Sequence, residues 1–290
     1  MILPFSAGAA SDTVGRLLGA KLSEQMGQNF IPDNRSGAGG SIGIGVAAKA
    51  APDGYSVLVS SPAIVLAPLL YSDVPFDALK DFVPIARLGT IENVMVVHPS
   101  VPAKTLKEFI ALARKSPGQL SFGSGGRGTT NHLANEALMF YQGLNMLHVP
   151  YKGAALATIA LMSGEVDEVV VGVAPALPMI RAGKVRPIVV LSEARVPQLP
   201  NIPTGAESGV PDFRMSIWYG LFAPAHTPPV ISARLTRETL KALETPDLKE
   251  RMNVVGVTAW PGNPNELSEL LRSETTRYRT IINGAKIKTR

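Results

Sequence analysis

Three turns made almost entirely of small residues constrain this chain most, because each lies between a strand-like segment and a helix-like one. They cover residues 4–12, 35–43 and 123–132, with the sequences PFSAGAASD, RSGAGGSIG and GSGGRGTTNH. Glycine lets a backbone approach a ligand closely, and the free N–H groups of a helix start favour negative charge. Three such turns predict a pocket that holds a carboxylate through uncharged donors.

Strand-like and helix-like segments alternate along most of the chain. Apolar residues at helical spacing predict a helix to about Met26, which Ser11 or Asp12 would cap. Thr105 is expected to cap another helix, which ends near Lys115. Alternation of this kind favours an α/β fold with mostly parallel sheets and helices on both faces. Strands are expected at residues 29–34, 55–60, 93–98, 119–123, 147–151, 165–173, 186–192, 215–223 and near 255–257, and further helices before 51, at 131–141, 153–163 and 175–182, and over most of 228–290.

The order of these segments predicts two domains, which a chain of 290 residues is long enough to form. The central block from about Pro99 to Pro211 carries its own strand–helix series, and the flanking pieces carry another. Strands near residues 93–98 and 216–223 would cross between the domains. The first domain is therefore expected at residues 1–97 plus 221–290 and the second at 98–220. Because open α/β sheets bind ligands at the carboxyl ends of their strands, we expect a ligand cleft between the two domains.

Composition excludes several classes of function. Charged residues make up 18% of the chain and the net charge is +5, but Lys and Arg are scattered, so nucleic acid is not an expected partner. The chain has no cysteine, which excludes disulfides and thiolate metal sites. No apolar run approaches the roughly 20 residues that span a bilayer.

The first residues give no sign of a signal peptide, since no basic segment precedes an apolar stretch. Residues 1–3 instead look like the middle of a strand that runs directly into the first turn. We interpret the chain as trimmed at its front.

Catalytic and metal-binding patterns were also sought. No pair of histidines has the spacing of a helical metal site, and residues 123–128 lack the Lys-Ser/Thr pair of a phosphate-binding loop. The sequence therefore predicts no catalytic residue, no metal and no cofactor. The four histidines are His98, His132, His148 and His226.

Two interpretations stay open for the third turn. His132 either donates to a ligand carboxylate or packs beneath the loop. Thr129 and Thr130 are helix caps, ligand donors or both, since a cap and a donor can occupy adjacent residues.

Elsewhere the residue types favour structural roles over contacts with a ligand. Asp12 is expected to be a cap or an acceptor for backbone N–H groups, and Phe5 either packs in the core or closes over an apolar part of a ligand. Trp218 and Tyr219 are expected to pack in the core. A solvated amine is the expected state of Lys152.

An ordered set of motifs carries a family resemblance that covers essentially the whole chain. The chain resembles the Bug family, the periplasmic solute-binding proteins of tripartite tricarboxylate transporters. The motifs are Pro4-Phe5-x-x-Gly8-x-x-x-Asp12, Asn34-Arg35-x-Gly37-Ala38-Gly39-Gly40, Ala51-Pro52-Asp53-Gly54-Tyr55, Asp81-Phe82-x-Pro84, Pro99-Ser100-x-Pro102-Ala103, Gly128-Thr129-x-x-His132-Leu133, His148-Val149-Pro150-Tyr151-Lys152-Gly153 and Leu221-x-Ala223-Pro224.

The resemblance implies a two-domain periplasmic-binding-protein fold of type II, the Venus-flytrap fold, without enzymatic activity. Such a protein would be a periplasmic monomer that captures a small organic carboxylate by domain closure and delivers it to the permease subunits of a transporter, with no cofactor. Carried over position by position, the implied ligand-binding residues are Phe5, Ser6, Gly8, Ala9, Ser11, Asp12, Ser60, Ser61, Ser124, Gly128, Thr129, Thr130, His132, Tyr151 and Gly172.

One departure from the family pattern bears on the ligand. Many members have an aromatic and an acidic residue after Gly-x-Val-Asp, whereas here residues 164–167 lead into a run of valines. A group that could bind a ligand amine is therefore missing, which favours a dicarboxylate or aromatic carboxylate over an amino acid. A sensory binding protein remains an alternative, and so does an enzyme of the same shape, for which Lys152, Asp12 and His132 would be the candidate residues.

Overall fold

The computed structural model of the protein describes residues 1–287, which form two compact units. Unit 1 consists of residues 1–90 and 218–280, and unit 2 of residues 91–217 and 281–287. The chain thus passes from unit 1 to unit 2 near residue 90, returns near residue 218 and enters unit 2 again after residue 280. The last three residues of the first predicted domain lie outside the described residues.

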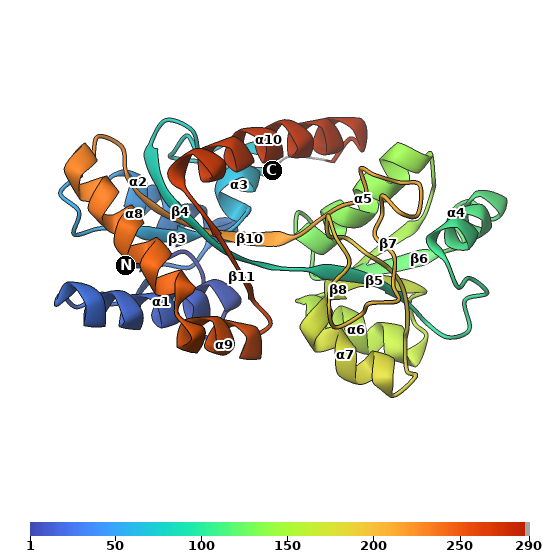
Figure 1. The fold of residues 1–290 in the computed structure, drawn as a ribbon. Helices are drawn as coiled ribbons and strands as arrows, with labels where there is room; N and C mark the ends of the chain where they lie inside the picture. The colour runs from blue at the N-terminus through green and yellow to red at the C-terminus, as the bar shows by residue number, and fades with distance from the viewer. Residues whose placement is uncertain (288–290) are drawn as a thin grey trace. The chain divides into compact units, whose positions relative to one another are not determined.

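Unit 1 contains a six-stranded sheet whose strand order is β11-β4-β10-β3-β1-β2 (Figure 1). Helix α1 packs against α8 and α9, and α2 packs against β1 and α3. The strands are β1 (Ile2–Leu3), β2 (Asp33–Asn34), β3 (Leu58–Ser60), β4 (Phe82–Ile91), β10 (Ile217–Pro224) and β11 (Thr258–Gly262). The helices are α1 (Ala10–Met26), α2 (Ser41–Ala48), α3 (Ala63–Leu70), α8 (Pro229–Glu244), α9 (Pro246–Val254) and α10 (Pro264–Gly284), and a 3₁₀ turn, η1 (Ala38–Gly40), precedes α2.

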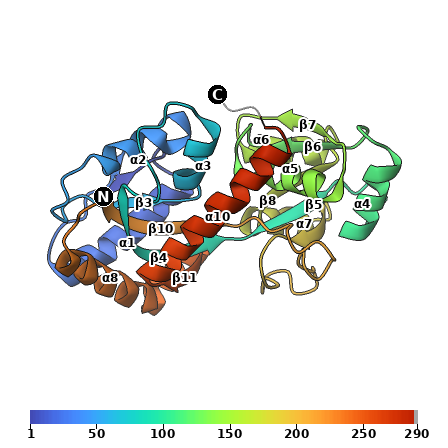
Figure 2. The same ribbon diagram turned by 90° about the horizontal axis from the view of Figure 1, so that it is seen from above.

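Unit 2 contains a five-stranded sheet in the order β7-β6-β8-β5-β9, with β6 and β7 side by side at one edge (Figure 2). Helices α6 and α7 cover one face and α5 covers the other (Figure 1). The apolar core on the α6–α7 side includes Val94, Val96, Leu161 and Val169. The strands are β5 (Asn93–Val97), β6 (Ser121–Ser124), β7 (Leu147–Pro150), β8 (Glu168–Gly172) and β9 (Arg186–Val190), and the helices are α4 (Leu106–Lys115), α5 (Thr130–Gln142), α6 (Ala154–Ser163) and α7 (Val173–Arg181).

The boundaries of the units differ from the predicted domain boundaries at 97/98 and 220/221. Strand β5 pairs with β8 and β9, so it belongs to unit 2 rather than to the first domain. Residues 218–220 belong to unit 1, because β10 pairs there with β3. Residues 281–287 belong to unit 2, where Gly284 lies against the ring of Phe140 on α5.

Both sheets are mixed, which corrects the prediction of mostly parallel sheets. Strands β2 and β3 run parallel to β1, and β7 and β8 run parallel to β6. Strand β10 is antiparallel to β3, and β5 is antiparallel to both β8 and β9. A helical crossover returns a chain parallel to the strand it left. Strands β5 and β10 enter their sheets from the other unit, so no crossover within the sheet makes them parallel.

Helix starts show where local prediction holds and where it fails. Thr105 caps α4 as predicted, since its hydroxyl accepts from the Glu108 N–H at 3.2 Å. The predicted cap of α1 was wrong, because Ala9 occupies the cap position and no side chain caps the helix. Gly8 has a φ of +83°, which turns the chain before Ser11 is reached.

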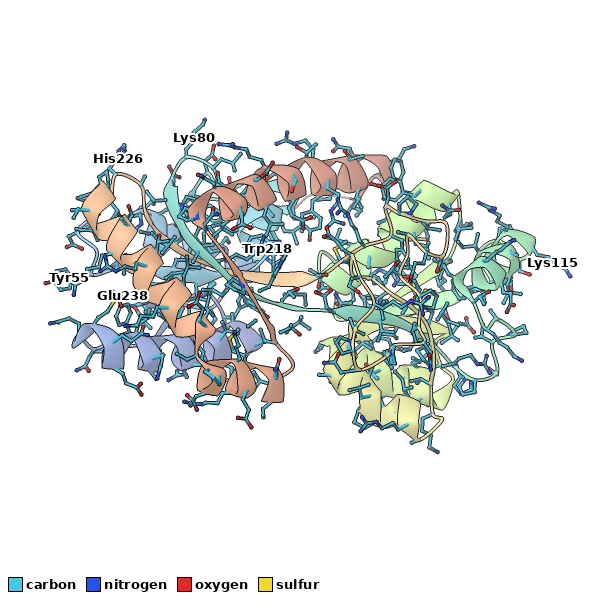
Figure 3. All side chains as sticks on the ribbon, viewed as in Figure 1. Tyr55, Lys80, Lys115, Trp218, His226 and Glu238 are labelled. Atoms are coloured by element: carbon cyan, nitrogen blue, oxygen red, sulfur yellow. The ribbon has the colours of Figure 1, made fainter. Side chains whose placement is uncertain are left out.

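Some elements were missed or displaced by the sequence prediction. Helix α3 is an apolar run with Pro68 inside it, so it shows no helical periodicity. Strand β4 was also missed, and the strand expected near 255–257 lies at β11. Trp218 and Tyr219 pack in the core as predicted, whereas Tyr55 projects into solvent (Figure 3). Within the described residues, no helix has the length and apolar character that crossing a membrane requires.

Candidate functional site

The start of α1 in unit 1 has several polar groups without partners. The N–H groups of Ala10, Ser11 and Asp12 have no acceptor among the described residues, as expected for an uncapped helix start. Ser11 is 4% exposed, and its hydroxyl also has no hydrogen-bond partner within residues 1–287. Buried polar groups in native proteins are normally paired, so this cluster of donors is suited to an anion.

Asp12 holds the first turn in shape. Its carboxylate accepts from the Gly8 N–H at 2.8 Å and from Arg16 Nε at 2.8 Å. Asn34 Nδ2 donates to Asp12 Oδ1 and to the Phe5 carbonyl, both at 2.9 Å. Burial would raise the pKa of Asp12, but the hydrogen bonds from Arg16, Gly8 and Asn34 together lower the pKa below its ordinary value. Asp12 is therefore an ionised acceptor for its own loop rather than a group that faces an anion.

Other predicted residues of unit 1 lie at the same edge of the sheet. The carboxyl ends of the parallel strands β1, β2 and β3 share this edge, and Ser60 and Ser61 follow β3 there, both buried. Gly40 has a φ of +97°, and a Cβ on it would lie 3.2 Å from Phe5 Cζ. The Phe5 ring thus packs against the second turn, close to the start of α3. Ser6, Gly8 and Ala9 form the first turn itself.

In unit 2, the third turn leads into α5. Thr129 is the cap: its hydroxyl donates to the Gly126 carbonyl at 2.7 Å and accepts from the His132 N–H at 3.4 Å. The Thr130 hydroxyl makes no hydrogen bond among the described residues, and the N–H groups of Thr130 and Asn131 have no acceptor there. The Thr129 hydroxyl therefore makes its hydrogen bonds inside the loop, whereas the Thr130 hydroxyl is available to donate to a ligand.

His132 packs beneath the third turn, which is one of the two interpretations that the sequence left open. The residue is 2% exposed, and its Nδ1 accepts from the Gly128 N–H at 3.2 Å. Its Nε2 lies 3.2 Å from Glu136 Oε1. Because both ring nitrogens have partners, His132 supports the loop and has no donor left for a ligand.

His148 and Ser124 form a contact that sequence reasoning missed. Ser124 Oγ lies 2.7 Å from His148 Nε2 and accepts from the Gly126 N–H at 3.1 Å. The His148 ring stacks on Phe122, with 4.8 Å between ring centroids, and its centroid lies 4.2 Å from that of His132. The contact depends on the strand register that places Phe122 opposite His148, since residues two apart on a strand share a face.

Burial lowers the pKa of His148 to about 4, and the nearby charges of His132 and Arg127 lower it further in the same direction. The ring is therefore neutral near pH 7. The Ser124–His148 contact has the donor–acceptor arrangement of a nucleophile and its base. However, Ser124 is completely buried and its oxygen already serves the loop, so no substrate reaches it.

The remaining predicted residues of unit 2 lie beside the third turn. The Tyr151 N–H donates to the Ser124 carbonyl at 2.9 Å, and burial raises the pKa of its phenol. Gly172 ends β8 and starts α7. The carboxyl ends of the parallel strands β6, β7 and β8 thus hold Ser124, Tyr151 and Gly172 at one edge. No group of three metal-ligating side chains occurs anywhere in residues 1–287.

Comparison with known proteins decides the family. Residues 14–287 match the model of the tripartite tricarboxylate transporter family receptor. The chain belongs to this family. It is 38% identical over 282 residues to the UPF0065 protein in the tcbD-tcbE intergenic region of Pseudomonas sp. strain P51, covering 97% of this chain and 84% of that protein. It is 33% identical over 292 residues to Protein BugT of Bordetella pertussis strain Tohama I, covering 99% and 90%.

Solved structures agree with this receptor family. The periplasmic binding protein BugD is 30% identical, with a TM-score of 0.80 over 100% of this chain and 98% of that one. R. palustris Rpa4515 with adipate is 30% identical, with a TM-score of 0.82 over 99% and 98%. MatC from Rhodopseudomonas palustris with bound malate is 30% identical, with a TM-score of 0.79 over 97% and 98%. The predicted Bug resemblance and binding-protein fold are confirmed. The family and the fold are those of solute-binding proteins rather than enzymes.

Proposed function

We propose that this receptor is a periplasmic solute-binding protein that captures a small organic dicarboxylate and delivers it to the membrane permease of a tripartite transporter. The observation that carries the proposal is the start of α1, where three N–H groups and the buried Ser11 hydroxyl have no hydrogen-bond partner in the described part of the chain. Helix starts with free N–H groups bind carboxylates well.

A second set of uncharged donors supports a ligand with two acidic groups. In unit 2 the Thr130 hydroxyl and the N–H groups of Thr130 and Asn131 are without partners among the described residues. Each set of donors would suit one carboxylate. Adipate and malate, which relatives of this chain hold, are both dicarboxylates. This favours a dicarboxylate over an aromatic monocarboxylate.

Uncharged donors suit this task energetically. A carboxylate that enters a buried site loses its water, and charge-assisted hydrogen bonds from N–H and O–H groups offset that loss. A buried lysine or arginine would add its own desolvation cost. Asp12 and His132, which the family resemblance also implied, would act by holding the two loops in shape.

A ligand screen tests the proposal. Purified protein is mixed with mono-, di- and tricarboxylates, aromatic ones included, and its melting temperature is measured, since a bound ligand stabilises the folded state by mass action. We expect dicarboxylates to raise the melting temperature, and Ser11→Ala to reduce that rise. Ser273→Ala is the matched control, because the Ser273 hydroxyl on α10 donates only to the Leu270 carbonyl. A screen in which no carboxylate raises the melting temperature overturns the proposal.

Delivery to a permease needs a separate test. Uptake of a labelled dicarboxylate is measured in cells that express the transporter's permease subunits with and without this receptor. Uptake that requires the receptor supports transport. Binding without receptor-dependent uptake would leave the sensory alternative as the better account of the protein.

A further inference from the structure

Two histidine side chains connect the third turn to the sheet of unit 2. His132 on α5 accepts from the Gly128 N–H through Nδ1, and His148 on β7 contacts Ser124 through Nε2. Ser124 in turn accepts from the Gly126 N–H. Each ring therefore supports one of the two glycines that give the turn its shape, with φ values of +122° at Gly126 and +80° at Gly128.

The contact with Gly128 requires that Nδ1 of His132 carry no proton, because a ring nitrogen that accepts a hydrogen bond has none. The other ring nitrogen, Nε2, faces Glu136. A proton on Nδ1 would point at the Gly128 N–H. Two donors would then face each other, and the hydrogen bond would be lost.

The two rings also constrain one another. The two ring centroids are 4.2 Å apart, so a positive charge on one ring would lie close to the other ring. Arg127 adds a further positive charge nearby. Two acidic groups lie near the pair: Glu136 on α5, whose Oε1 is 3.2 Å from His132 Nε2, and Glu168 on β8, which pairs with Phe122 on the same face of the sheet as His148. Phe122, which stacks on His148, contributes no polar group. The packing therefore disfavours a positive charge on both rings at once.

We propose that His132 and His148 are positioning residues, which as an adjacent pair hold the third turn in the shape that presents the Thr130 hydroxyl and the free N–H groups of α5 to the ligand. The effect on affinity rests on the function proposed above. The effect on the loop does not, because it concerns contacts within unit 2 alone.

The first experiment measures the loop without ligand. Amide hydrogen exchange of Gly126, Gly128 and Thr129 is followed by NMR in the wild type, His132→Leu and His132→Asn. We expect about tenfold faster exchange at Gly128 in His132→Leu, and near wild-type exchange in His132→Asn, whose side-chain oxygen can replace Nδ1 as acceptor. Equal exchange in all three proteins overturns the proposal, whatever the ligand turns out to be.

The second experiment measures affinity, with adipate and malate as probes in calorimetry at pH 7.5. His148→Gln keeps a polar group near Ser124, and we expect its affinity to stay within about threefold of the wild type. His148→Lys places a permanent charge in the stack, and we expect a loss of about tenfold or more. His98→Asn is the control, because His98 lies outside the turn and contacts Ser100. Circular dichroism confirms folding of each variant.

A pH profile separates positioning from a general loss of packing. The wild type should keep its affinity to well below pH 6 and lose it near the pKa of His148, which is about 4. The ligand's own carboxyl groups titrate in the same range, so the wild type is compared with His148→Gln at each pH. We expect the variant to lose less affinity on acidification. Superimposable profiles, or equal affinity of His148→Gln and His148→Lys at pH 7.5, overturn the proposal. If neither probe binds any of the proteins while exchange behaves as expected, the proposed ligand class is wrong and the positioning role stands.

Discussion

Ser124 Oγ lies 2.7 Å from His148 Nε2 and joins the end of β6 to the neighbouring strand β7. The pKa of His148 is lowered to about 4 when the protein is folded and is about 6.5 when the chain is unfolded. Between these pH values the unfolded state binds more protons than the folded state. The contribution of this pKa shift to the unfolding free energy is therefore complete above pH 6.5 and is lost as the pH falls through 4. We expect a loss of about 1–2 kcal/mol, reduced by solvent because the ring is only half-buried.

Urea unfolding at pH 7, 5.5 and 4.5 measures this loss. The difference in unfolding free energy between the wild type and His148→Gln should shrink as the pH falls, because the variant has no histidine to protonate at this position. An unchanged difference over the whole pH range would contradict the assignment of the titration to His148.

Glu168 should make the protein less stable as the pH rises. The residue is completely buried on β8, and neither carboxyl oxygen has a well-placed hydrogen-bond partner among the described residues. Burial raises its pKa well above the ordinary value, and a contact with Asn135 offsets this only in part. A raised pKa contributes stability below the unfolded value, and that contribution is lost as the pH rises through the folded value.

Replacing Glu168 by glutamine tests this prediction. The amide has nearly the same shape but never ionises, so Glu168→Gln should be more stable than the wild type by about 1–3 kcal/mol at pH 8, and by less at pH 5. Denaturant midpoints at both pH values give the comparison, with the exposed Glu250→Gln as control. A variant that is less stable than the wild type at pH 8 would show that the carboxylate has a partner.

The two threonines at the start of α5 should separate stability from affinity. Thr129→Ala removes a helix cap, so we expect a loss of about 1 kcal/mol in unfolding free energy. Thr130→Ala removes a hydroxyl without an internal partner, so stability should hardly change while dicarboxylate affinity falls by about 1–3 kcal/mol. Thermal melts and calorimetry measure the two quantities.

Thr105→Ala is the matched control for the capping effect, since Thr105 caps α4 in the same way. It should cost similar stability and leave affinity unchanged. Thr130→Ala with wild-type affinity for every ligand that stabilises the protein would remove Thr130 from the proposed site.

Asp12→Asn should weaken the first turn. The variant loses the ion pair with Arg16 and one charged acceptor for the Gly8 N–H, both at 2.8 Å in the wild type. Because the group is buried, we expect a loss of about 2–3 kcal/mol in unfolding free energy. Glu24→Gln breaks an exposed pair with Lys21 and should change stability by less than about 0.5 kcal/mol. Chemical denaturation of both variants measures the difference, and equal losses would count against a structural role for Asp12.

Much of the fold was predictable because it depends on neighbouring residues. The caps at Thr105 and Thr129 need only a hydroxyl beside a helix-forming segment, and both were anticipated. The start of α1 was misjudged because Asp12 is drawn into contacts with Asn34, which is distant in sequence. The direction of β5 and β10 was misjudged for a similar reason, since local pattern does not encode which sheet a strand joins.

The sequence by itself determined where the small-residue turns lie and which family the chain resembles, because turns and motifs are properties of short segments. Only the tertiary structure decided which polar groups in those turns stay without partners. Ser124 and His132 use theirs inside the third turn, whereas Ser11 and Thr130 do not. The physical reason is strand register: the pairing of β6 with β7 brings His148 to Ser124 across 24 residues, and spacing in the sequence carries no record of that contact.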